Sequence, residues 1–167
     1  GDNTALYYGG EREFADFKSY LVANGFERIV GEQDFDRKDW SSKWGAHDHV
    51  VLGRLLVDAR SFGRPFFTTL FTLSSHEPYD VPMKPELAGT SEQTHFLNAH
   101  IYTDRSPGHF FAHASHETWW DSTLFLLIPH HRPPPPNLSP PPGPNPSHLL
   151  HHPLLPLCRR PPAPPPL

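Results

Sequence analysis

The 167-residue chain has little cysteine, no long apolar run and no basic stripe, and each absence excludes a class of protein. The single cysteine, Cys158, cannot build a disulfide framework or a cysteine metal site. No apolar stretch approaches the roughly 20 residues that span a bilayer, and we expect no signal or membrane segment within the chain. The chain opens at "GDNTALYYGG" without Met, already close to a strand pattern, so we expect it to be part of a longer protein.

Acidic residues are missing from one part of the chain only. Residues 1–128 hold all 18 Asp and Glu against 11 Lys and Arg, a balance of −7. Residues 129–167 hold 17 of the 22 prolines and three arginines, a balance of +3. The acidic body argues against a nucleic-acid partner, because nothing there would neutralise phosphates. For the proline-rich tail we expect polyproline II or disorder and neither helix nor sheet ladder.

Hydrophobic periodicity predicts strands that alternate with helices over 4–128, so the sequence predicts an α/β domain whose mostly parallel sheet carries helices on both faces. The expected strands are 4–8, 26–30, 64–73 and 122–128, and the expected helices are 11–24, 44–62 and 94–114. The run "RPFFTTLFTL" (64–73) is near-continuously apolar, which is typical of a strand buried on both faces. Pro107 is expected to kink or break the last helix near Ser106.

Chemistry in such sheets lies in loops beyond the carboxyl ends of the strands. Three loops qualify: Gly9-Gly10, "SSHEPY" (74–79), and whatever follows Ile128. His76 in the second loop can donate to an anionic oxygen or move a proton. The simpler alternative is a loop histidine that caps a helix or binds water.

"WGAHDH" (44–49) offers two interpretations. His47 and His49 form an H-x-H pair, which can bind a metal on a strand. A helix is expected to begin here instead, and Asp48 is then an acidic residue favoured by the helix dipole.

Five segments, in order, resemble the lipoteichoic acid synthase-like branch of the sulfatase family, which belongs to the alkaline phosphatase superfamily. They are "LYYGGEREFADFKSYLVANGFERIV", "SSKWGAHDHVVLGRLL", "PFFTTLFTLSSHEPYDVP", "FLNAHIYTDRSPGHFF" and "WWDSTLFLLI". The resemblance covers residues 4–128 and implies a partial alkaline phosphatase/sulfatase-like fold, followed by the proline-rich tail at 129–167.

The resemblance implies a metal-dependent phosphoglycerol transferase, or a hydrolase of phosphate or sulfate esters, acting with Mn²⁺, Mg²⁺ or Ca²⁺. It also implies a bacterial protein held in the cytoplasmic membrane by N-terminal helices, with the catalytic domain outside. His76 matches the family histidine that contacts the phosphate end of the substrate. Tyr8-Gly9-Gly10 matches a substrate-pocket loop, so Tyr8 and Gly10 are expected to bind substrate. The loop has glycines where the synthases carry polar groups, so the resemblance does not fix the substrate. The nucleophilic Thr and a metal-binding Glu are expected upstream of this chain.

The family's metal-binding turn reads Ala-Asp-His-Gly after the last strand, whereas this chain reads "PHHR" (129–132). His131 matches the histidine ligand, but His130 replaces the aspartate, which is a hard oxygen ligand suited to these metals. We therefore expect the chain to bind no metal and to be inactive. A change of reading frame near codon 128 or 129 would explain the tail, and translating the other two frames of the gene tests it. The alternative is a genuine polyproline arm on a non-enzymatic binding module.

Overall fold

A computed structural model describes residues 3–11, 17–128 and 155–157. The chain divides into two units, Gly1–Ala114 and Ser115–Leu167, and each is described by itself. The predictions for His130 and His131 lie outside the described residues.

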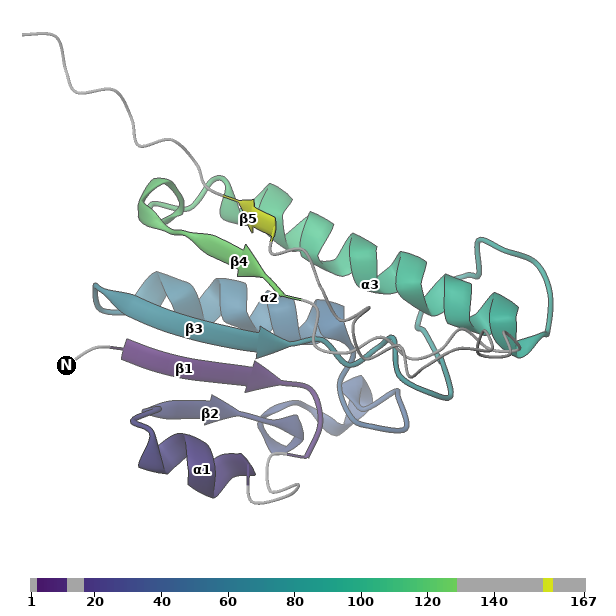
Figure 1. Cartoon of the computed structure of the whole chain (residues 1–167), viewed down its shortest axis with the longest axis horizontal. Coiled ribbons are helices and arrows are strands. Elements are labelled where there is room, and N and C mark those ends of the chain that lie inside the picture. Colours follow the sequence, from purple (N-terminus) through teal and green to yellow (C-terminus); the bar gives the residue numbers. More distant parts are fainter. Residues whose placement is uncertain (1–2, 12–16, 129–154, 158–167) are drawn as a thin grey trace, which may run out of the picture. The chain divides into compact units, whose positions relative to one another are not determined.

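The first unit is built on a three-stranded parallel sheet of order β2-β1-β3 (Figure 1). Its strands are β1 (Asn3–Tyr8), β2 (Arg28–Val30) and β3 (Phe66–Phe71). Tyr7 of β1 lies opposite Val30 on one side and Leu70 on the other. β1 is the central strand, and its apolar residues Ala5, Leu6 and Tyr7 are at most 3 % exposed. The predicted parallel α/β sheet is confirmed.

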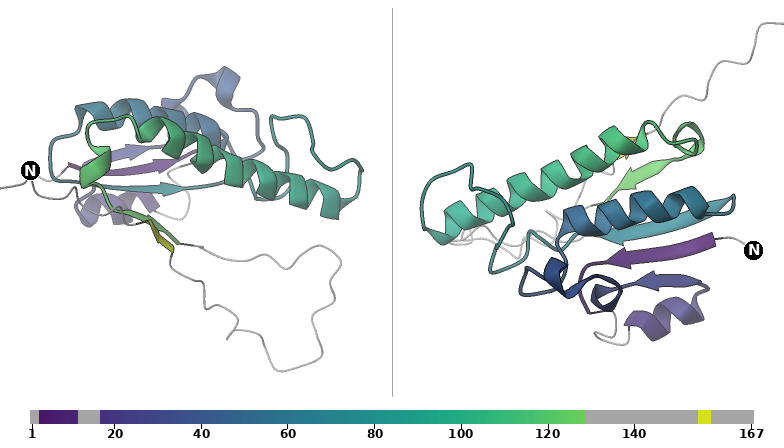
Figure 2. Two further views of the ribbon diagram at one scale, coloured as in Figure 1. Left: turned by 90° about the horizontal axis from the view of Figure 1, so that it is seen from above. Right: turned by 180° about the vertical axis from the view of Figure 1, so that it is seen from behind.

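Helices lie on both faces of this sheet (Figure 2). α1 (Phe17–Ala23) and α2 (Asp48–Asp58) lie on opposite faces, and the long α3 (Glu92–Ala114) packs beside α2. Short 3-10 turns follow β2 and α2, at Glu32–Asp34, Arg37–Asp39 and Ala59–Ser61. Val51 and Leu52 of α2 are buried, and Val51 joins Ala5, Tyr7, Val30 and Ala46 in the core.

Strand β3 corrects one prediction, since it is not buried on both faces. Phe67 is 58 % exposed, and the other residues of β3 are half-buried. Within the described part of the first unit β3 pairs on one side only, with β1, whereas β1 pairs on both sides. The near-continuous apolar run therefore does not mark a strand buried on both faces here.

Helix α3 corrects one alternative of the prediction for Pro107. The helix runs from Glu92 to Ala114 with Pro107 inside it, so the expected break near Ser106 is wrong. Proline removes one backbone N–H, which costs the helix one hydrogen bond. In the turn before it, the Ser106 hydroxyl donates to the Tyr102 carbonyl at 3.0 Å, and both residues are buried. We infer that packing of this buried face outweighs the local penalty of the proline.

The second unit contains the 3-10 turn Trp120–Ser122 and two short strands, β4 (Phe125–Leu127) and β5 (Leu155–Leu157). These strands pair antiparallel, with Leu126 opposite Pro156. The expectation that the tail forms no sheet ladder is therefore wrong for residues 155–157. Proline is tolerated in short edge strands where its missing N–H is not needed by a neighbour, which is compatible with this pairing.

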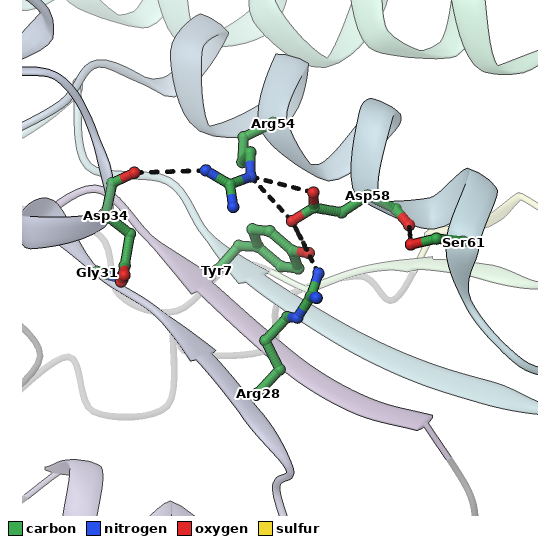
Figure 3. A network of polar contacts seen from close by, with 7 residues as sticks. All are labelled: Tyr7, Arg28, Gly31, Asp34, Arg54, Asp58 and Ser61. Carbon is green, nitrogen blue, oxygen red and sulfur yellow. Dashed lines mark hydrogen bonds and ion pairs between the residues drawn. The ribbon is translucent and has the colours of Figure 1, made fainter.

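A polar network ties β1, β2 and α2 together at the last residue of α2 (Figure 3). The buried Tyr7 hydroxyl donates to Asp58 Oδ2 at 2.8 Å, and Arg28 and Arg54 each reach the same oxygen at 3.0 Å. Burial is the main reason that the pKa of Tyr7 rises to about 12. Arg54 also donates to the Asp34 carbonyl at 3.4 Å. This network supports the fold and lies at the opposite end of α2 from the loops considered next.

Candidate functional site

Two of the loops singled out in the sequence come together at the carboxyl edge of the parallel sheet. Residues 9–10 follow β1, residues 72–79 follow β3, and α2 begins at Asp48 between them (Figure 1). This edge is where open α/β sheets bind ligands. The third loop, after Ile128, lies outside the described residues.

The loop after β1 crosses the segment before α2 at very short range. The Ala46 N–H donates to the Gly9 carbonyl at 2.8 Å. A Cβ on Gly9 would lie 2.1 Å from the Ala46 carbonyl oxygen, and a Cβ on Gly45 would lie 2.1 Å from the Gly9 oxygen. Gly45 also has a φ of +129°, which favours glycine. Gly9 and Gly45 thus allow the two backbones to approach closely. The interpretation of residues 8–10 as a substrate-pocket loop does not by itself explain this packing role.

Tyr8 and Gly10 flank this crossing. Tyr8 is half-buried and Gly10 is buried, and a Cβ on Gly10 would lie 2.8 Å from the Tyr8 ring. Burial, and secondarily the charge of Glu32, raises the pKa of the Tyr8 hydroxyl. Tyr8 is therefore a neutral hydroxyl at the edge of the sheet.

Asp48 and Ser74 form a reciprocal pair between α2 and the loop after β3. The Asp48 carboxylate, 1 % exposed, accepts the backbone N–H of Leu73 at 2.7 Å and of Ser74 at 3.2 Å. In return the Ser74 hydroxyl accepts the Asp48 N–H at 3.1 Å. The Thr103 hydroxyl of α3 donates a further hydrogen bond to Asp48 Oδ2 at 3.3 Å. Desolvation raises the pKa of the Asp48 carboxyl, although these hydrogen bonds act in the opposite direction.

His47 and His49 do not converge on a common point that could hold a metal. His47 Nδ1 lies 3.2 Å from the Ser74 hydroxyl, whereas His49 Nδ1 contacts the Tyr102 hydroxyl. Among the residues that the structure describes, no group of three or more His, Cys, Asp or Glu could hold a metal ion. Asp48 is the first residue of α2, as the helix-dipole alternative predicted, and its oxygens are engaged by N–H and O–H donors. These three residues therefore do not form a metal site at the H-x-H motif. The segment in which the family resemblance implies metal ligands, 129–132, lies outside the described residues.

His76 lies exposed in the turn after β3. Its backbone N–H donates to the Leu73 carbonyl at 3.1 Å, and its carbonyl accepts the Tyr79 N–H at 2.8 Å. Its ring stands edge-on to Trp44, with centroids 6.3 Å apart. The Trp44 indole N–H donates to the Glu77 carbonyl, and Lys43 Nζ lies 4.9 Å from the Trp44 ring centre. An imidazole and an ammonium thus flank one exposed indole.

Sequence reasoning missed Lys43 and Trp44. Both precede the H-x-H motif, but their neighbour His76 lies more than 30 positions later. The only available signal was an aromatic residue followed by glycine at the start of "WGAHDH", and that pattern does not identify a partner.

The chain is similar in sequence and fold to several known proteins. A crystal structure of an alkaline phosphatase-superfamily protein from Vibrio parahaemolyticus superposes with a TM-score of 0.68 and 32 % identity, covering 77 % of this chain and 32 % of that one. The chain is thus similar in sequence and fold to a member of the alkaline phosphatase superfamily. Lipoteichoic acid synthase-like YvgJ of Bacillus subtilis is 21 % identical over 129 residues, which are 74 % of this chain and 21 % of YvgJ. No family model matches.

The resemblance to the lipoteichoic acid synthase-like branch is confirmed. The fold is also shared with the lipoteichoic acid synthase LtaP of Listeria monocytogenes, with a TM-score of 0.66 and 20 % identity over 76 % of this chain and 33 % of LtaP. The chain spans between a fifth and a third of the lengths of these alkaline phosphatase-superfamily relatives. Within the described residues no helix is long and apolar enough to cross a membrane.

The stability of this protein is expected to fall as the pH drops through about 6.5, because His47 is buried. Desolvation, followed by the charge of His49, lowers the pKa of His47 below its ordinary 6.5, while the Ser41 backbone and Asp80 act in the opposite direction. The unfolded chain therefore binds the proton more tightly, so stability is full above pH 6.5 and is lost toward the lowered pKa. Urea unfolding of the wild type and His47→Gln from pH 8 to pH 5.5 measures this loss.

The wild type should lose stability in that window relative to His47→Gln. Asp48 lies beside His47, and its raised pKa makes its own contribution to stability change with pH in the opposite direction. Asp48 is present in both proteins, so its contribution cancels when their pH profiles are compared. His109→Gln, on the exposed surface of α3, is the matched control and should keep the wild-type pH slope. Parallel pH profiles for the wild type and His47→Gln would contradict the assignment.

Proposed function

We propose that this chain contributes the substrate-binding edge of a metal-dependent phosphoglycerol transferase, or of a related phosphate- or sulfate-ester hydrolase. The similarity to lipoteichoic acid synthase-like YvgJ supports the reaction class. The setting proposed for the intact protein is the outer side of a bacterial cytoplasmic membrane. The substrate would be an ester whose anionic end must be held by donors.

The observation that carries the proposal is the position of His76. It is exposed at the carboxyl edge of the parallel sheet, in a turn whose backbone is hydrogen-bonded on both sides of it. An imidazole N–H aimed at an anionic oxygen makes a charge-assisted hydrogen bond when the acceptor is ionised. Lys43, close by over Trp44, adds positive charge to the same surface.

Tyr8 and Gly10 are proposed to border the pocket for the rest of the substrate. The raised pKa of the Tyr8 hydroxyl keeps it a neutral donor at physiological pH. Gly9 and Gly10 keep side chains out of the space where the loop meets Ala46 and Tyr8.

Binding without turnover is the behaviour we propose for this chain. His47, Asp48 and His49 are engaged with other protein groups, so no reaction step is assigned to a metal held by them. The turn that resembles the metal-binding segment of the family carries His130 where an aspartate is expected.

His76→Ala is expected to weaken binding of glycerol 1-phosphate by about 10- to 100-fold, because one charge-assisted hydrogen bond contributes about 1.5–3 kcal/mol. Isothermal titration calorimetry on the full chain measures the affinity, with glycerol as the ligand that lacks the anion. His109→Ala makes the same substitution at an exposed site on α3 and should bind like the wild type. Equal affinities of the wild type and His76→Ala would refute the role of His76.

A further inference from the structure

Helix α2 begins without a cap of its own. Its N-cap residue, His47, makes no side-chain capping bond to the helix. The hydroxyl that accepts the Asp48 N–H belongs to Ser74, which lies 26 positions later in the chain. Ser74 therefore acts as a capping residue supplied by a different segment.

The capping contact is reciprocal. A capping box joins a serine hydroxyl and an acidic side chain, each accepting the other's backbone N–H. Ser74 and Asp48 make these two bonds across two loops, at 3.1 Å and 3.2 Å, instead of within one helical turn. His47 Nδ1 lies 3.2 Å from the same hydroxyl, and both side chains are buried. The pair thus fixes the start of the loop after β3 to the start of α2.

The backbone of one residue, Leu73, connects Asp48 to His76 through hydrogen bonds. Leu73 gives its N–H to Asp48 Oδ1 at 2.7 Å, and its carbonyl receives the His76 N–H at 3.1 Å. On the other side of His76, the backbone of buried Tyr79 donates to the His76 carbonyl at 2.8 Å, and the Tyr79 ring packs on Phe96 of α3. The His76 backbone is therefore held from two helices.

We propose that Ser74 and Asp48 are positioning residues that fix the backbone of His76 at the ligand-binding edge. The proposal deepens the proposed function and rests on it for the identity of the ligand. Neither residue is proposed to touch the ligand, because both are at most 5 % exposed.

The test compares Ser74→Ala and Asp48→Asn with Ser75→Ala in the full chain. Ser75 is the neighbouring, half-buried serine and takes no part in the capping pair, so it is the matched control. Two readouts apply: the NMR signals of the His76 imidazole with the exchange rate of its amide, and the affinity for glycerol 1-phosphate. Ser74→Ala and Asp48→Asn should shift the His76 signals, speed its amide exchange and weaken binding by about tenfold each. Ser74→Thr, which retains the hydroxyl, should restore the wild-type signals.

Unchanged His76 signals in both Ser74→Ala and Asp48→Asn would overturn the proposal, as would an equal effect of Ser75→Ala. Loss of the whole fold in both variants, seen by far-ultraviolet circular dichroism, would also overturn it, since the pair would then be a general support. If the wild type binds no glycerol 1-phosphate, the proposed function fails, and the NMR signals still decide whether the pair positions His76. If His76→Ala loses binding and Ser74→Ala does not, the proposed function stands and the positioning role falls.

Discussion

Replacing Asp48 with alanine is expected to lower the free energy of unfolding by about 3 kcal/mol, because two buried backbone N–H groups lose their acceptor. Leu73 and Ser74 donate to this carboxylate at 2.7 Å and 3.2 Å, and Thr103 donates at 3.3 Å. A methyl group at position 48 accepts none of these bonds. Urea unfolding followed by circular dichroism measures the loss.

The negative charge of Asp48 contributes less to the stability of the fold than the hydrogen bonds that its oxygens accept. Burial raises the pKa of this carboxyl, so the protein already disfavours the ionised form. We therefore expect Asp48→Asn, which keeps one acceptor oxygen, to lose less stability than Asp48→Ala. Asp36→Ala is the matched control, because Asp36 is exposed and pairs with the exposed Lys38. Asp36→Ala should lose less than about 0.5 kcal/mol of unfolding free energy. An equally small loss in Asp48→Ala would contradict the stabilising role of the buried Asp48 carboxyl.

Local patterns in the sequence predicted the elements of the first unit well. The alternation of apolar runs and helical faces gave a parallel sheet, and the structure has one in the order β2-β1-β3. Helix α2 begins at Asp48, within the segment where an acidic N-terminus was predicted. Such features depend on neighbours within a few residues, which the sequence displays directly.

Features that depend on distant partners could not be predicted in the same way. The apolar composition of β3 suggested a strand buried on both faces, but the burial of a strand depends on which elements pair with it and cover it. Pro107 indicated a break that packing of α3 overrides. The pairing of Ser74 with Asp48, and of His76 with Trp44, joins segments 26 and 32 positions apart, and only the fold specifies such partners.

The loop glycine Gly9 gives the second large expected effect. Gly9→Ala should destabilise the protein by about 3 kcal/mol, because the new Cβ would lie 2.1 Å from the carbonyl oxygen of Ala46. That neighbour is backbone and cannot rotate away, so the two loops must separate. Their separation also weakens the bond from the Ala46 N–H to the Gly9 carbonyl, which is 2.8 Å long.

The same substitution at Gly53 should have the opposite effect on stability. Gly53 is exposed in the middle of α2, and a Cβ there meets nothing within 4 Å. Alanine reduces the backbone entropy lost on folding, so Gly53→Ala should stabilise the protein by about 0.5–1 kcal/mol. Urea unfolding of both variants measures the difference, and a Gly9→Ala protein as stable as Gly53→Ala would show that the two loops do not cross as closely as described. A loss at Gly9 and a gain at Gly53 would instead assign the cost to the crossing of the loops, since the chemical change is identical.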